Sequence, residues 1–165
     1  MSTSCTPIDI HTHVVPEHFP AYAGSRADAA WPAMAPAHAC HRHVMLKGSV
    51  YRTVSEQAWR SDRRTEAMDR VEVGRQVLSP MPELLSYWLA PEDGAALCRY
   101  LNEQIAAMVA AAPDRFFGLG AVPLQDVDRA IEALEHAVGP LGLDGVEIGT
   151  NVDGVVLGDP SLEPF

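Results

Sequence analysis

The sequence contains few cysteines and no long hydrophobic run. Its three cysteines, Cys5, Cys40 and Cys98, are odd in number and widely spaced, so we expect reduced thiols rather than a disulfide framework. No apolar run approaches the roughly 20 residues that span a bilayer. The first nine residues, MSTSCTPID, have neither the basic nor the apolar region of a signal peptide. These absences predict a cytoplasmic protein with no membrane partner.

Positive charge is scarce in the second half of the chain. Residues 1–75 carry nine Lys and Arg against eight Asp and Glu, whereas residues 76–165 carry three against fourteen. An acidic half repels a phosphate backbone, so nucleic acid is not an expected partner. The near-neutral half keeps several arginines close to histidines, which is compatible with an anionic small-molecule substrate.

The chain shows an alternation of apolar strands and amphipathic helices within the 165 residues of an ordinary single domain. Alternation with short links predicts an α/β fold with a parallel sheet and right-handed crossovers. Pro80 and Pro113 end two of these segments, and Asp126 is a plausible N-cap. The expected strands are 7–11, 75–80, 116–123 and 144–149, and the expected helices are 61–73, 91–115, 126–138 and one beginning at 159.

The stretch 14–56 interrupts this rhythm. It is rich in Ala, Pro and His, and its segment HVMLKGSVYRT predicts a β-hairpin that turns at Lys47 and Gly48. An insertion after the first strand lies at the face where parallel strands end, and that face holds the active site in α/β proteins. We therefore expect residues 14–56 to cover a functional site, with a plain surface excursion as the alternative.

Two histidines, His11 and His13, follow the first strand with one residue between them. Side chains alternate along an extended strand, so these two imidazoles point the same way and can reach one ion. Neutral imidazole suits Zn²⁺. The H-x-H pattern alone is weak, and a loop with two solvated histidines is an equal alternative at this point.

A second H-x-H lies in the segment CHRH, from Cys40 to His43. Together with Cys5 it could form a separate thiolate–imidazole zinc site. It lacks the second close ligand pair expected of a structural zinc module. We therefore favour a histidine-rich loop that faces the pocket.

Several segments, in order along the chain, resemble the amidohydrolase superfamily, and most closely the branch of aminocarboxymuconate semialdehyde decarboxylase and its decarboxylase-like relatives. The resemblance covers essentially the whole chain. The segments that carry it are IDIHTHVVPEHF, RRTEAMDRVEVGRQVLSP, APDRFFGLGAVPLQDVDRAIEAL and LGLDGVEIGTNVDG with LGDPSLEPF.

The resemblance implies a distorted (β/α)₈ barrel with one catalytic zinc, of which His11 and His13 would be two ligands. It places a third ligand His after strand five, a catalytic His after strand six and a ligand Asp after strand eight. By position, Arg52 matches a family Arg that binds the substrate carboxylate, and Lys47 lies near a basic family residue, although offset. Trp88 could line an aromatic pocket for a ring substrate, or simply pack its loop.

A complete barrel needs eight βα units and about 250 residues. Residues 1–165 are therefore predicted to be the first half of a TIM-like barrel, with four βα units, a β-hairpin insertion after strand one and no catalytic residue of their own. Because two ligands do not complete a zinc site, we expect residues 1–165 alone to have little or no activity. Open sheet edges favour pairing with another chain, and one hypothesis is a homo-oligomer in which two copies close a barrel.

The function predicted by lineage is a metal-dependent, non-oxidative decarboxylase of a small unsaturated or aromatic carboxylic acid. Two alternatives stay open: an amidohydrolase-type hydrolase of a lactone or amide, and a non-catalytic truncated product.

Two further residues have open interpretations. Glu147, between Val146 and Ile148, could lie near metal or substrate, but we favour a buried partner for an arginine such as Arg75. Asn151 is expected to hydrogen-bond a backbone turn.

Overall fold

A computed structural model describes residues 6–26 and 30–165 of the chain. Four parallel strands form its central sheet in the order β1-β5-β6-β7. Each new strand is added beside the previous one, as in the wall of a barrel, and not on both sides of the first strand as in a doubly wound sheet. The strands are β1 (Ile8–Val14), β5 (Arg75–Pro80), β6 (Phe116–Gly120) and β7 (Gly145–Val146).

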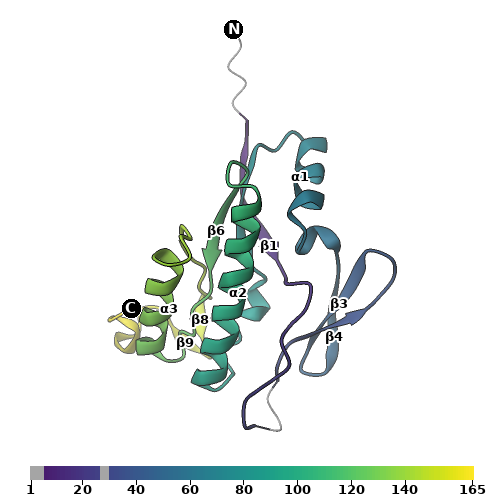
Figure 1. The fold of residues 1–165 in the computed structure, drawn as a ribbon. Helices are drawn as coiled ribbons and strands as arrows, with labels where there is room; N and C mark the ends of the chain where they lie inside the picture. Colours follow the sequence, from purple (N-terminus) through teal and green to yellow (C-terminus); the bar gives the residue numbers. More distant parts are fainter. Residues whose placement is uncertain (1–5, 27–29) are drawn as a thin grey trace.

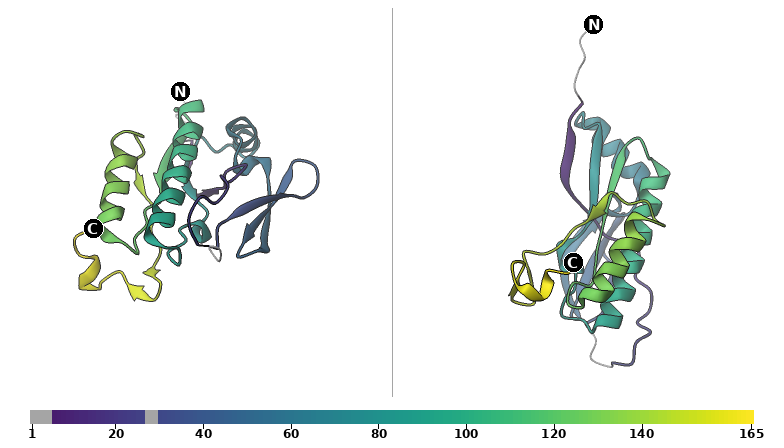
Figure 2. Two further views of the ribbon diagram at one scale, coloured as in Figure 1. Left: turned by 60° about the horizontal axis from the view of Figure 1, so that its bottom comes forward. Right: turned by 90° about the vertical axis from the view of Figure 1, so that its left-hand side faces the viewer.

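The helices α1 (Ser61–Arg70), α2 (Pro91–Ala111) and α3 (Val127–Val138) alternate with these strands. Figure 1 and Figure 2 show α2 and α3 side by side on one face of the sheet, with the C-terminal segment on the other side. The apolar stripe of α2 is buried against the sheet as its 3.6-residue period predicts. Its buried members are Leu97, Cys98, Leu101, Ile105 and Met108. The described helices include none with the length and apolar character that crossing a membrane requires.

The insertion after β1 forms an antiparallel sheet of β2 (Ala33–Pro36), β3 (His41–Leu46) and β4 (Ser49–Ser55). Lys47 and Gly48 have φ values of 50° and 76°, the left-handed conformation that a tight two-residue hairpin turn requires. The predicted hairpin and its turn are therefore confirmed. A single turn of 3₁₀ helix, η1 (Glu56–Ala58), connects β4 to α1.

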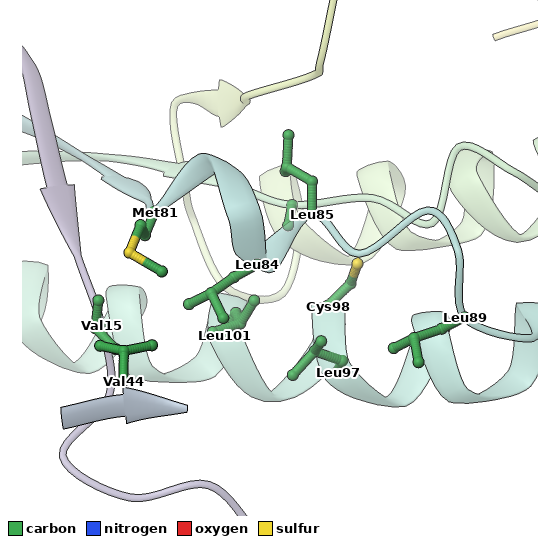
Figure 3. Close-up of a cluster of buried hydrophobic side chains, with 10 residues drawn as sticks. Val15, Val44, Met81, Leu84, Leu85, Leu89, Leu97, Cys98 and Leu101 are labelled. Atoms are coloured by element: carbon green, nitrogen blue, oxygen red, sulfur yellow. The ribbon is translucent and has the colours of Figure 1, made fainter. Parts of the chain in front are cut away.

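The hairpin is fastened to the barrel wall by apolar packing. Val44 of β3 is fully buried and belongs to the same core cluster as Leu84 and Leu97. Figure 3 shows Val44 and Val15 against Leu101, with Met81 and Leu84 above them. Because this cluster joins the insertion, the segment after β5 and α2, it fixes the hairpin over the end of the sheet where β1 finishes.

The C-terminal part departs from the expected pattern. Only Gly145 and Val146 of the predicted strand 144–149 pair in the ladder. The hairpin of β8 (Asn151–Val152) and β9 (Val155–Val156) follows. Residues 159–165 form a 3₁₀ turn, η3 (Pro160–Leu162), in place of the predicted helix. Pro164 would lack the amide proton that continuation of an α-helix needs.

Candidate metal and substrate site

The two histidines after the first strand converge. The Nε2 atoms of His11 and His13 lie 3.3 Å apart, with the two rings edge to face at an interplanar angle of 78°. Both side chains therefore extend from one face of β1, as strand alternation predicts. This convergence favours a joint role over two independently solvated loop histidines.

His13 is held in one orientation by the end of the neighbouring strand. Its Nδ1 atom lies 3.0 Å from Ser79 Oγ and 3.1 Å from the Pro80 carbonyl oxygen. A carbonyl can only accept, and the Ser79 hydroxyl already donates to the Thr12 carbonyl at 3.1 Å. Nδ1 therefore carries the proton, and the Nε2 lone pair of His13 is directed toward His11. The partners Ser79 and Pro80 were not predicted, although the ends of parallel neighbours always meet at one edge.

Arg64 on α1 fixes the backbone of the same histidine. Its guanidinium donates to the His13 carbonyl at 2.9 Å, the Gln57 carbonyl at 2.9 Å and Gln76 Oε1 at 3.1 Å. Burial lowers the pKa of Arg64 to about 10, an effect that the charge of Asp9 partly opposes. The guanidinium of Arg64 thus links η1, β1 and β5 through hydrogen bonds, one of which is to the backbone of His13.

Glu147, the residue that directly follows β7, approaches the histidine pair. Its Oε2 atom lies 3.8 Å from His13 Nδ1, is buried and has no hydrogen-bond partner within residues 6–26 and 30–165. Arg75 instead places its guanidinium 5.5 Å from the Phe117 ring centre. The interpretation of Glu147 as the buried partner of Arg75 is therefore wrong, and the interpretation that places it beside the candidate metal site agrees with the geometry.

A cavity of about 490 Å³ adjoins this carboxylate. Tyr87 and Trp88 form part of its wall, and the Tyr87 hydroxyl accepts a hydrogen bond from the Gly149 amide at 3.0 Å. Burial raises the pKa of Tyr87. Asn151, at another part of the rim, accepts from the Gly154 amide at 3.0 Å, which confirms its expected turn role. The aromatic part of this wall suits the planar part of a small ligand.

The two predicted cationic substrate residues lie on the hairpin. Lys47 Nζ is 4.6 Å from the Trp88 ring centre, a cation–π contact between the hairpin tip and the cavity wall. Arg52 is exposed on β4, with its guanidinium 5.7 Å from the Tyr51 ring centre. The structure thus brings Lys47 to Trp88, while neither Lys47 nor Arg52 lines the cavity itself.

The two histidines of the second H-x-H, His41 and His43, contact residues of the insertion itself. Nδ1 of His41 lies 2.9 Å from the Ala39 carbonyl, and Nδ1 of His43 lies 2.8 Å from Thr53 Oγ1. The proposed third member, Cys5, lies outside the described residues. Across residues 6–26 and 30–165, no group of three or more His, Cys, Asp or Glu side chains is arranged to hold a metal ion.

The residues present fit part of a divalent-metal site. His11 and His13 supply two imidazole nitrogens at one place, and the proton on Nδ1 of His13 leaves its Nε2 free to coordinate. Two donors fall short of the four ligands of a tetrahedral ion. The described part of the chain therefore offers a pair of candidate ligands and not a closed site.

The strand order of a barrel wall and the histidine pair near the end of β1 are the features that indicate the family of this chain. A sequence model of the amidohydrolase family matches residues 8–165, and the chain belongs to that family. The predicted family and fold class are therefore confirmed.

Among curated proteins, the chain is 37% identical over 158 residues to a 2-amino-3-carboxymuconate-6-semialdehyde decarboxylase of Dictyostelium discoideum. The match covers 96% of this chain and 44% of that protein. The chain thus spans less than half the length of the curated relatives it matches.

Two solved structures show how far the likeness extends. A 2,6-dihydroxybenzoate decarboxylase complexed with 2,6-dihydroxybenzoate is 28% identical with a TM-score of 0.58, over 62% of this chain and 34% of that one. A 5-carboxyvanillate decarboxylase of Novosphingobium aromaticivorans, complexed with manganese, has a TM-score of 0.62 over 66% of this chain and 31% of that one. Its 23% identity supports the fold alone.

Proposed function

We propose that this chain forms the first part of the active site of a divalent-metal-dependent, non-oxidative decarboxylase of a small unsaturated or aromatic carboxylic acid. The observation that carries the proposal is the convergence of His11 and His13, with the proton of His13 held on Nδ1. The decarboxylase relatives support the reaction class.

His11 and His13 would hold the ion, for which Zn²⁺ is our first choice and Mn²⁺ the alternative. When bound, such an ion would act as a Lewis acid, and Zn²⁺ would lower the pKa of a water ligand to about 7. Ser79, Pro80 and Arg64 keep the ligand pair in place, because they fix the ring and the backbone of His13.

Substrate binding is assigned to Trp88, Lys47 and Arg52. Trp88 would pack against the planar part of the substrate in the adjoining cavity. Lys47, whose Nζ atom lies 4.6 Å from the Trp88 ring centre, and Arg52 on the same hairpin would bind carboxylate groups through charge-assisted hydrogen bonds. Residues 14–56 would then act as the cover of the site.

Residues 1–165 alone are expected to turn over slowly or not at all, since two imidazoles do not complete a metal site. The remaining ligands and the catalytic acid or base would come from chain segments beyond these residues. Cytoplasmic location and assembly into a homo-oligomer stay predictions.

The first experiment measures metal binding by the 165-residue chain. Zn²⁺ and Mn²⁺ are titrated against a chromophoric chelator with the wild type, His11→Ala, His13→Ala and the control His43→Ala. We expect binding by the wild type and the control and a loss of at least tenfold in affinity in the other two variants. Equal affinity in all four proteins would remove the metal site from the proposal.

The second experiment measures the reaction. Release of CO₂ from 2-amino-3-carboxymuconate-6-semialdehyde and from 2,6-dihydroxybenzoate is followed with this chain and with the product of its complete reading frame. We expect CO₂ from the longer protein only. Hydrolysis of a lactone or amide without CO₂ release would instead identify the hydrolase alternative.

A further inference from the structure

The backbone around Glu147 is held by hydrogen bonds, although the Oε2 atom of its side chain has none within the part of the chain that the structure describes. Its own amide donates to the Gly120 carbonyl at 2.8 Å, and the amide of Gly149 donates to the Tyr87 hydroxyl at 3.0 Å. The backbone is therefore fixed on both sides of the side chain. The buried Oε2 atom nevertheless lacks a hydrogen-bond partner among the described residues. Burial of a charged atom without such a partner lowers the stability of the fold.

The direction of this side chain follows from the curvature of the sheet. Strands β1 and β7 are separated by β5 and β6, or about 14 Å in a flat sheet with strands about 4.8 Å apart. Val146 packs into the core on the helix side, so Glu147 points to the opposite face. There its Oε2 atom comes within 3.8 Å of His13 Nδ1. The two side chains thus meet over the concave face of the barrel wall.

The atom that faces Glu147 is the protonated nitrogen of His13. Ser79 Oγ and the Pro80 carbonyl accept from this Nδ1 atom, and the carboxylate adds a negative charge at ion-pair distance. Negative charge behind the Nδ1 proton strengthens the electron-pair donation of Nε2, the atom that faces His11. Histidines that bind metals are commonly supported in this way by a carboxylate on their second nitrogen.

We propose that Glu147 is a positioning residue of the histidine pair, whose carboxylate supports His13 from behind and increases the affinity of the pair for a divalent cation. The inference rests on the proposed metal site and adds to it the residue that directly follows β7, the fourth strand of the sheet. It also explains why the buried Oε2 atom of Glu147 is kept beside the cavity that Tyr87 and Trp88 line.

The test uses the 165-residue chain and Zn²⁺ as the probe, by competition with a chromophoric chelator at pH 7.5. Glu147→Gln removes the charge and keeps the shape, and Glu147→Asp keeps the charge with a shorter reach. Glu135→Gln, an exposed position on α3, is the matched control for loss of one negative charge. Circular dichroism and thermal unfolding report whether each variant is folded.

We expect Glu147→Gln to bind Zn²⁺ about tenfold more weakly than the wild type. Glu147→Asp carries its charge farther from His13, so it should bind more weakly than the wild type and more tightly than Glu147→Gln. Glu135→Gln should match the wild type. If the Gln variant does not fold, a folded Asp variant with an affinity between those of the wild type and His13→Ala supports the proposal, and wild-type affinity overturns it.

Two other results would overturn the inference in distinguishable ways. Wild-type affinity in a folded Glu147→Gln, with affinity lost in His11→Ala, would remove Glu147 and leave the metal pair intact. A wild-type chain that binds Zn²⁺ no better than His11→Ala would remove the metal pair itself, and the role of Glu147 with it.

Discussion

Arg64→Ala should destabilise the fold far more than a neighbouring arginine substitution on the same helix. Arg64 donates three hydrogen bonds, to acceptors on η1, β1 and β5. Hydrogen bonds from a charged group contribute roughly 1.5–3 kcal/mol each, so their loss amounts to about 5–9 kcal/mol. The depressed pKa, about 10 against 12.5, corresponds to about 3 kcal/mol of desolvation cost that the alanine variant no longer carries.

The net loss in the free energy of unfolding is therefore about 2–6 kcal/mol, a large part of the roughly 5–15 kcal/mol of a typical domain. The matched control is Arg63→Ala. Arg63 pairs with Glu56 at 2.9 Å and Glu66 at 3.1 Å, but its side chain is 42% exposed. Such surface ion pairs contribute about 0–1 kcal/mol.

The assay is urea denaturation at pH 7 followed by circular dichroism at 222 nm. If Arg64→Ala lies within 1 kcal/mol of Arg63→Ala, the three hydrogen bonds do not carry the stability assigned to them. The same variant should also weaken Zn²⁺ binding, because the carbonyl of His13 loses its anchor.

Two further predictions concern stability and thiol chemistry. Asp126→Ala should lower the free energy of unfolding by about 1 kcal/mol in the same urea assay. The Asp126 side chain caps α3 by accepting a hydrogen bond from the Arg129 amide at 3.1 Å. Asp128→Ala removes no such cap and should therefore lower the free energy of unfolding by less. In a Cys5→Ser background, Cys40 should react with a thiol reagent at pH 8 within minutes and Cys98 only on unfolding, because burial raises the pKa of Cys98 to about 12. Since the unfolded chain ionises this thiol near pH 9 while the folded chain keeps the proton, stability should also fall as pH rises from about 9 to 12; fast labelling of folded Cys98 would contradict both statements.

Local patterns predicted much of the fold. The strand at 75–80 has the predicted bounds, and α3 begins after the predicted cap. These features depend on neighbours within a few residues, so the sequence contains their cause. The hairpin at Asp153 and Gly154 was missed, although a Val-flanked Asp-Gly is a strong hairpin signal.

The candidate site was only partly predictable. Strand alternation was enough to place His11 and His13 on one face. The approach of Glu147 could not be read from its neighbours, because it depends on the curvature of a sheet whose outer strands are separated by more than 130 residues of chain. Nor does the sequence show that Lys47 contacts Trp88, since that depends on how the hairpin packs through Val44.

The order of strands in the sheet has a consequence for how the chain is made. Because β5 pairs with β1, β6 with β5 and β7 with β6, each strand finds its partner among segments already synthesised. The sheet can therefore form during synthesis, once the strands β2–β4 and helix α1, which separate β1 from β5 in the chain, have been synthesised. Such vectorial assembly would put the two histidines in the nascent protein first, and the residues that orient them would arrive one strand at a time.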